Sequence, residues 1–224
     1  MATMQNTMKY LCENIQGCVF GYTQSDEITL ILIDYQTFNT DAWFNYEVQK
    51  MCSISASMAT MAFNKYFYSA ILEWYSKTVP DDLSQEREIV KQAKIYKNAA
   101  EKGAMFDSRC FNIPKEEVAN LIYWRQLDAS RNSIQMVGQA NFSQAELEGK
   151  SCNDIQDMLM LQKGINWNNF PTYCKRGSCC IKKQIVDNDM QTIRDAWQID
   201  LDIPIFKGED RNYIEQFIYV GEGL

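Results

Sequence analysis

The stretch from Gly17 to Asp34, GCVFGYTQSDEITLILID, limits the possible folds of this chain more than any other segment. Two apolar runs rich in β-branched and aromatic residues flank a short polar segment, which predicts a β-hairpin. Because side chains alternate between the two faces of a strand, we expect Ser25 and Glu27 on one face and Asp26 on the other. Only one of the two carboxylates would then face a given site. The apolar runs span residues 18–23 and 28–33, and the tip is Gln24, Ser25, Asp26 and Glu27.

The composition is that of an ordinary globular protein. With 224 residues, 46% of them hydrophobic and 23% charged, the chain can bury a full core, and we expect one domain over residues 1–224. No apolar run approaches the roughly 20 residues that span a bilayer. No signal peptide opens the chain. We therefore expect a cytoplasmic protein without a membrane segment.

Eight cysteines and the complete absence of histidine limit the possible chemistry. The cysteines lie mostly in apolar segments, which predicts reduced, buried thiols. The cluster of Cys174, Cys179 and Cys180 has no second cysteine pair and no histidine, so it is a weak zinc signal. Without histidine, Ser-His and Cys-His nucleophiles are excluded. The remaining options are carboxylates, lysine, arginine, hydroxyls or a metal ion.

The net charge of −7 argues against general coating of nucleic acid. A local basic patch is still possible, because four basic residues lie within nine positions. A solvated basic surface with no ligand is the alternative. The four residues are Lys175, Arg176, Lys182 and Lys183.

The other segments predict helices and strands in an irregular order. Asp41 and Ser143 are expected N-caps, and Glu146 follows Ser143 at the spacing of a capping box. Pro114 is expected to open the longest helix of the chain. This order favours an α+β fold with helices on one face of the sheet over a doubly wound fold. The expected helices cover residues 1–15, 41–67, 83–102, 115–142, 143–148, 151–163, 189–196 and 210–218, and the further strands 104–113, 178–186 and 199–203.

A carboxylate on a hairpin tip and a polar helix face suit phosphoryl transfer with divalent metal ions. Arg125, Asp128 and Asn132 stand at i, i+3 and i+7 and should share one face of their helix. Magnesium usually takes one or two protein carboxylates together with substrate phosphates. Two ions about 3.5 to 4 Å apart would stabilise the attacking and the leaving oxygen together. The alternative is an acidic tip that serves only solubility, since polar residues are common in turns.

Five sequence blocks carry a family resemblance. They are QSDEITL, FDSRCFNIPKEEV, WRQLDASRNSIQMV, GKSCND and GINWNNFPTYCKRG, in that order. Together they resemble the tRNA-His guanylyltransferase family, and most closely its bacterial and archaeal branch, which repairs 5′-truncated tRNA. The resemblance implies a palm-like polymerase core, an antiparallel sheet with helices packed on it, that adds nucleotides in the 3′ to 5′ direction. The RNA 5′ end is first activated, by adenylylation or as a triphosphate, and the 3′ hydroxyl of the next nucleotide attacks it.

The same resemblance implies roles for individual residues. Asp26 is expected to bind metal and to act in catalysis with Glu27 and Asp128. The implied cofactor is magnesium at a two-ion site, ATP and GTP are the implied substrates, and tRNA is the implied partner of a homotetramer. The lysines and arginines would suit phosphate binding in any family, and Trp167 could stack on an unpaired base. The implied nucleotide contacts are Ser25, Arg125, Arg131 and Asn132, and the implied tRNA contacts are Lys150, Asn168, Lys175 and Arg176.

The sequence departs from the family pattern in two places. Eukaryotic members carry a His-Ile-Asn-Asn motif where this chain has Ser-Arg-Asn-Ser at residues 130–133, which favours the repair branch. The family also supplies a metal-binding aspartate from an Asp-Gly strand ahead of the first helix, and Met1 already lies in that helix. Asp107 belongs to a different family segment and does not replace it. We therefore expect a fold without that strand, an incomplete metal site and an open strand edge prone to association.

Two other functions compete with tRNA extension. The first is a catalytically impaired homologue that still binds tRNA. The second is another palm-type enzyme, such as a nucleotide cyclase, that acts without RNA.

Overall fold

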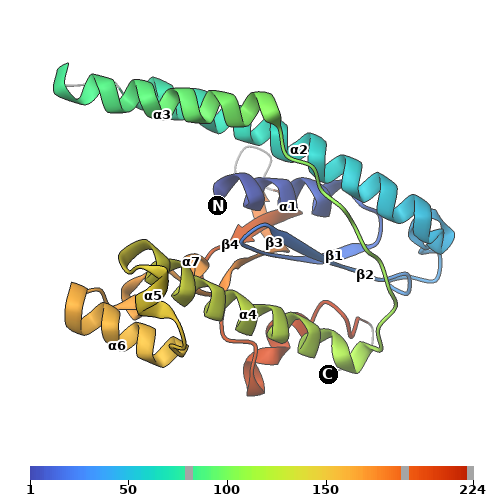
Figure 1. Ribbon diagram of the computed structural model, residues 1–224. Helices are drawn as coiled ribbons and strands as arrows, with labels where there is room; N and C mark the ends of the chain where they lie inside the picture. The colour runs from blue at the N-terminus through green and yellow to red at the C-terminus, as the bar shows by residue number, and fades with distance from the viewer. Residues whose placement is uncertain (79–82, 188–191, 221–224) are drawn as a thin grey trace.

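The computed structural model describes residues 1–78, 83–187 and 192–220. Its centre is a four-stranded antiparallel sheet in the order β2-β1-β3-β4 (Figure 1), which confirms the α+β class. Gln24 pairs with Glu27 at the end of the first hairpin, so Ser25 and Asp26 alone form its turn. The strands are β1 (Cys18–Gln24), β2 (Glu27–Leu32), β3 (Ser178–Asp187) and β4 (Thr192–Asp200).

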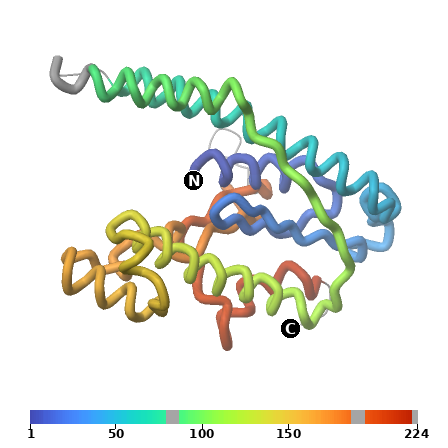
Figure 2. The backbone as a smooth tube through the Cα atoms, viewed as in Figure 1, coloured from blue at the N-terminus to red at the C-terminus, as the bar shows by residue number. Residues whose placement is uncertain are grey.

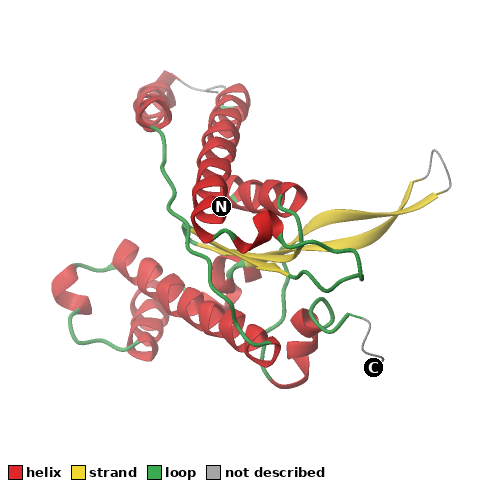
Figure 3. Ribbon diagram, turned by 90° about the vertical axis from the view of Figure 1, so that its right-hand side faces the viewer, coloured by secondary structure: helices red, strands yellow, loops and turns green. Residues whose placement is uncertain are grey.

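Helices cover both faces of the sheet (Figures 1 and 3), so the prediction of helices on one face is wrong. Every residue of β1 is buried, and a strand that is apolar on both faces needs cover on both sides. One face carries α1 (Ala2–Asn14), with α2 (Val48–Lys77) and α3 (Leu83–Lys102) beyond it. The other face carries α4 (Lys115–Asn141) and the C-terminal α8 (Asn212–Glu215).

Each face has its own hydrophobic core. Under α1, the side chains of Met8, Leu11 and Cys12 pack on Cys180. A Cβ atom at Gly21 would lie only 2.5 Å from the Cys12 sulfur, so glycine lets α1 approach β1 closely. Under α4, the fully buried side chains include Phe20, Tyr22, Ile122, Phe206 and Ile214.

A third cluster extends α4 into a separate lobe. Ile134 and Phe142 pack against Ile155 and Leu159 of α6 (Cys152–Lys163). The short α5 (Gln144–Leu147) precedes α6. Ser143 and Glu146 form the predicted capping box of α5, and α6 has a further capping box at Ser151 and Asp154 that was not predicted. One continuous helix therefore spans the sheet and this lobe.

The long second helix differs from the prediction at both ends. Asp41 does not cap it, because η1 (Trp43–Tyr46) intervenes and α2 follows Glu47. Residues 44–46 have positive φ angles, which an α-helix cannot include. At its other end α2 continues to Lys77, where Trp74 packs edge-on against Tyr96 of α3 with ring centroids 5.1 Å apart. At 30 residues α2 is longer than α4, which has 27 and was expected to be the longest.

Residues 104–113 form no strand, contrary to the prediction; we call this segment the strap. It runs along α2, where the Asn64 side chain binds the backbone of Ala104 through N–H and C=O. The Phe106 N–H donates to the Thr60 hydroxyl at 3.1 Å. The apolar pattern that resembles a strand therefore packs against a helix.

The C-terminal region differs most from expectation. The expected helix at 189–196 begins outside the described residues, and from Thr192 onward the chain is β4. β3 and β4 pair over nine positions and project from the sheet as a two-stranded ribbon (Figure 3). Residues 199–200 end β4, and 201–203 are not a strand. In place of the expected helix at 210–218, the chain forms η3 (Gly208–Arg211) followed directly by the short α8.

All eight cysteines are free thiols, four of them buried and four partly exposed. Cys179 and Cys180 lie in the cores on opposite faces of the sheet, so they cannot share a metal ion. Throughout the described ranges, no group of three cysteine, aspartate or glutamate side chains is placed to hold a metal ion. None of the described helices combines the length and hydrophobicity that a membrane crossing requires.

Candidate nucleotide and tRNA site

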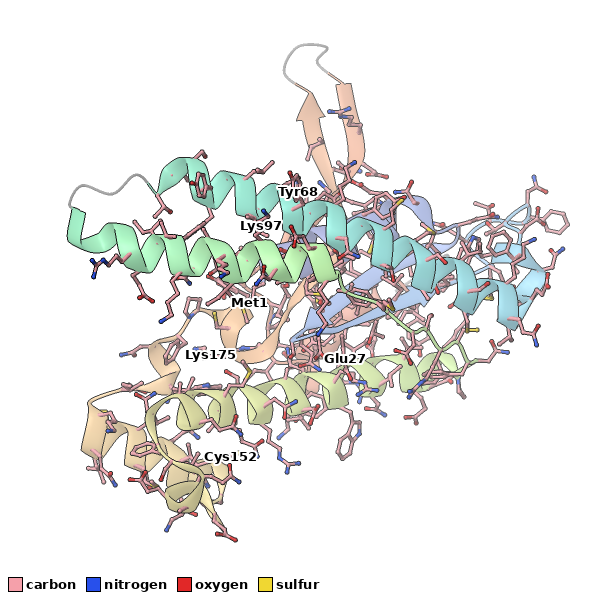
Figure 4. All side chains as sticks on the ribbon, turned by 45° about the horizontal axis from the view of Figure 1, so that its top comes forward. Met1, Glu27, Tyr68, Lys97, Cys152 and Lys175 are labelled. Carbon is pink, nitrogen blue, oxygen red and sulfur yellow. The ribbon has the colours of Figure 1, made fainter. Side chains whose placement is uncertain are left out.

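Polar side chains at the tip of the β1-β2 hairpin lie on opposite faces of the hairpin. Ser25 has a φ angle of 49° and lines a cavity of about 10 Å³ with Met4 and Gln5 of α1. Glu27 lies on the opposite face, beside α4 (Figure 4). The expected common face for Ser25 and Glu27 is therefore wrong, because the two-residue turn reverses the chain between them.

Asp26 is the second residue of this two-residue turn. Its side chain is exposed and forms no hydrogen bond or ion pair with another described residue. Its carboxylate oxygens are therefore open to a ligand that arrives from solvent.

Glu27 links the hairpin to α4. One of its carboxylate oxygens lies 3.5 Å from a guanidinium nitrogen of Arg125 and accepts a 3.0 Å hydrogen bond from the Gln24 side chain. Nearly half of both charged side chains is exposed, and ion pairs of this kind contribute less than about 1 kcal/mol. The contact orients Arg125 toward the hairpin tip and adds little to stability.

The next turns of α4 continue this polar surface. Asn132 donates a 3.1 Å hydrogen bond to the carboxylate of Asp128. Burial raises the pKa of Tyr22 on β1, and the negative charges of Asp128 and Glu27 add to the rise. Glu27 contacts Arg125 of α4, so Glu27 and Asp128 lie on the α4 side of the sheet.

Tyr22 also fixes the position of α7 (Thr172–Arg176). Its hydroxyl donates a 2.7 Å hydrogen bond to the carbonyl of Arg176, across 154 residues of sequence. The next residue, Gly177, has a φ angle of 83° and lies against β1. Two cationic residues, Lys175 and Arg176, are thereby attached directly to the strand that leads to Asp26.

A short loop docks beside α7 on the surface of α4. Lys175 donates a 2.6 Å hydrogen bond to the carbonyl of Asn168 in η2 (Trp167–Asn169), and its ammonium lies 5.7 Å from the centre of the Trp167 ring. The indole N–H of Trp167 donates to Ser133 of α4 at 3.1 Å. Three of the four predicted tRNA contacts, namely Asn168, Lys175 and Arg176, are therefore neighbours.

Comparison with known proteins shows which protein family this chain belongs to. A sequence profile of the tRNA(His) guanylyltransferase family matches residues 1–114. The chain belongs to this family. A solved bacterial tRNA(His) guanylyltransferase-like protein in complex with ATP shares 38% identity and a TM-score of 0.76 over 98% of this chain and 79% of its own. A second, in complex with GTP, shares 36% identity and a TM-score of 0.71 over 97% and 77%.

The tRNA(His) guanylyltransferase of Saccharomyces cerevisiae is 24% identical over 74% of this chain. This family member spans less than two thirds of the length of the curated relatives that it matches, namely 58% and 63% for two of them.

The remaining sequence candidates of this tRNA(His) guanylyltransferase family member have exposed positions. Lys150 is exposed in the turn between α5 and α6, and Arg131 is exposed on α4. Asp107 lies on the strap, where it pairs with Arg109 at 3.4 Å. Lys150 could therefore reach only the outer part of a long ligand.

Sequence reasoning missed two residues that organise the site, Tyr22 and Gln24. A tyrosine within an apolar strand is a usable signal, because a buried hydroxyl normally needs a hydrogen-bond partner. Gln24 gives no comparable signal, since its partner Glu27 becomes a neighbour only when the hairpin closes.

The donor atoms at the hairpin tip suit magnesium. Magnesium prefers hard oxygen ligands and needs only one or two protein carboxylates when phosphates complete its shell. Asp26 provides an exposed carboxylate, and the adjacent Glu27 provides a second one that is held by Arg125. Asp26 with Glu27 is therefore the set of residues in this family member that fits such an ion.

Proposed function

We propose that this chain adds nucleotides to the 5′ end of tRNA in the 3′ to 5′ direction, directed by a template. The observation that carries the proposal is the exposed Asp26 carboxylate on a hairpin that meets Arg125 on α4. Membership of the tRNA(His) guanylyltransferase family supports it, as do the similar bacterial proteins in complex with ATP and GTP. Eight free thiols fit a reducing compartment and support a cytoplasmic location.

In this proposal the hairpin and α4 bind the triphosphate between them. Asp26 would hold magnesium, which supplies positive charge to the phosphate oxygens during phosphoryl transfer. Arg125 and Arg131 contact phosphates, while the Asp128–Asn132 pair orients the nucleotide. Ser25 stays a predicted nucleotide contact, although its side chain lies on the face opposite Glu27.

The tRNA side of the site is cationic. Asn168, Lys175 and Arg176 lie together beside α4, and Lys150 extends the surface to the α5–α6 lobe. Such residues bind the RNA backbone by releasing its counterions. We therefore place the 5′ end of the RNA between α7 and the hairpin tip.

The test is extension of a tRNA that lacks its first nucleotide. The purified chain is incubated with this RNA, ATP, GTP and magnesium, and product length is read on a gel. We expect extension by at least one nucleotide that stops when magnesium is chelated. If the RNA binds but is not extended, the proposal is overturned in favour of an impaired tRNA-binding homologue.

One structural feature favours that second function. Of the three predicted catalytic carboxylates, Glu27 and Asp128 have hydrogen-bond or ion-pair partners, and Asp26 has none among the described residues. A magnesium site with few ligands would bind substrate and still fail in chemistry.

A cyclase-type function without RNA predicts instead that replacing Lys175 and Arg176 with alanine leaves nucleotide turnover unchanged.

Arg125→Ala is expected to weaken ATP binding at least tenfold. Hydrogen bonds to charged groups contribute about 1.5–3 kcal/mol, and about 1.4 kcal/mol is a factor of ten. The free energy of unfolding should fall by less than about 1 kcal/mol, because the Glu27 contact is half-exposed. Calorimetric titration with ATP measures the loss.

The matched control is Arg109→Ala, which removes an exposed arginine–carboxylate pair on the strap. It should leave ATP binding within a factor of two. Equal losses in both variants would contradict a specific role for Arg125.

We also propose that the chain forms a homo-oligomer through α2. Ile54, Met61, Tyr68 and Tyr75 are exposed at intervals of seven residues, and Leu72 lies among them. They form one apolar stripe, and α2 and α3 extend well beyond the sheet (Figure 2). A seven-residue apolar repeat is typical of a helix that packs along another helix.

Replacing Met61 and Tyr68 together with glutamate should lower the mass in solution to that of one 26.0 kDa chain. The two charges would lie in the buried centre of the interface. Analytical ultracentrifugation measures the mass, and Lys77→Glu, an exposed change at the far end of α2, serves as the control. A wild-type chain that is already monomeric at micromolar concentration would contradict the proposal.

A further inference from the structure

Two cysteine thiols meet where the strap crosses α2. The sulfur of Cys52 on α2 lies 3.4 Å from the sulfur of Cys110 on the strap, although 58 positions separate them in sequence. Both residues are partly exposed. The pair is therefore accessible to a small reagent from solvent.

The surrounding contacts hold the two sulfurs in this position. Ser55, one helical turn after Cys52, donates a 2.7 Å hydrogen bond to Ser108, two residues before Cys110. Further along, Thr60 and Asn64 fasten the strap to α2 through its backbone. A disulfide has an S–S distance of about 2.05 Å, so the sulfurs need to approach by only about 1.4 Å.

We propose that Cys52 and Cys110 form a reversible disulfide by exchange with a low-molecular-weight disulfide such as oxidised glutathione. One protein thiolate attacks the glutathione disulfide, forms a mixed disulfide and releases one glutathione thiolate. The second protein thiolate then attacks the protein sulfur of the mixed disulfide and releases the second glutathione. The two protein thiols lose two electrons and two protons in total, and the small disulfide is reduced to two glutathione thiols.

The other cysteines are placed differently. Cys12 lies next to both Cys18 and Cys180, and all three are buried in the α1 core, where an oxidant cannot reach them. Cys152 and Cys174 are partly exposed, but no thiol contact is present at either within the described ranges. We therefore expect these two to form mixed disulfides at most.

The disulfide would fasten the strap to the N-terminal part of α2. It would close a long loop that contains α3, and the strap leads directly into α4. Closing such a loop restricts the unfolded chain. Burial, and then contact with Cys52, raises the pKa of Cys110, so the exchange should become faster as the pH rises and the thiolate fraction grows.

The experiment treats the full-length chain with oxidised glutathione, blocks the remaining thiols and maps the peptides by mass spectrometry. We expect a cross-linked peptide that joins Cys52 to Cys110, reversal by dithiothreitol, and a Tm about 10 °C higher in the oxidised form. Cys52→Ser should abolish the cross-link and leave glutathione on Cys110, whereas Cys152→Ser should leave the cross-link unchanged. Mixed disulfides on both Cys52 and Cys110 of the wild-type chain, or an unchanged Tm after complete cross-linking, would overturn the proposal. Because the wild-type peptide map alone decides the connectivity, the test does not depend on the variants folding.

Discussion

Asp26→Asn is expected to reduce nucleotide addition at least a thousandfold. The amide keeps the size of the side chain and removes the charge that would hold magnesium against the phosphates, an interaction of several kcal/mol in the transition state. Each 1.36 kcal/mol is a factor of ten in rate. Because the side chain is exposed, the free energy of unfolding should change by no more than about 0.5 kcal/mol. Single-turnover extension of a 5′-truncated tRNA measures the rate.

The matched control for this prediction is Asp107→Asn. Asp107 is also an exposed aspartate, but it lies on the strap beside Arg109. Its replacement should leave the rate within a factor of two. Binding of tRNA should be unchanged in both variants, since the cationic residues of α7 are intact. If Asp26→Asn retains more than a tenth of the activity, Asp26 is not the metal ligand.

Gly177→Ala is expected to destabilise the fold by about 4 kcal/mol and to lower Tm by about 10 °C. The φ angle of 83° disfavours any side chain, and the added Cβ would lie 2.6 Å from the carbonyl oxygen of Thr23. That oxygen belongs to β1, which is paired on both sides and cannot move aside. The Cβ would also lie 2.8 Å from the Tyr22 hydroxyl and disturb its bond to Arg176. Backbone strain, overpacking and the weakened hydrogen bond together account for this loss of about 4 kcal/mol.

Gly164→Ala tests the cost of a positive φ angle at a position where the added methyl group meets no clash. Gly164 has a φ angle of 67°, but no atom lies within 4 Å of an added Cβ. Its replacement should therefore show only the left-handed penalty of roughly 1–2 kcal/mol. Denaturant unfolding of both variants measures the difference. Equal losses of unfolding free energy in the two variants would show that the Gly177 contact with β1 does not contribute to stability.

Local chemistry made much of this fold predictable. The β1-β2 hairpin follows from two dense apolar runs around a polar tip, and α5 follows from a capping box that begins at Ser143. In each case, the residues that decide the structure are neighbours in sequence. The α+β class follows from the order of these segments.

The failures occur where distant partners decide the structure. The strap has an apolar pattern that suits a strand, but α2 provides its hydrogen-bond partners. β4 shows helical spacing, yet the long β3 pairs with it residue by residue. In the site, the position of Arg176 depends on Tyr22, which is 154 residues away. No local pattern contains that information.

The central claim is that the hairpin tip and the polar face of α4 form one site for a metal-bound triphosphate. The most direct measurement is diffraction from crystals of this chain grown with GTP and manganese, whose anomalous signal locates the ion. The account predicts an ion bound by the Asp26 carboxylate, with the triphosphate extending to Arg125. A triphosphate bound elsewhere, with Asp26 in bulk solvent, would contradict it.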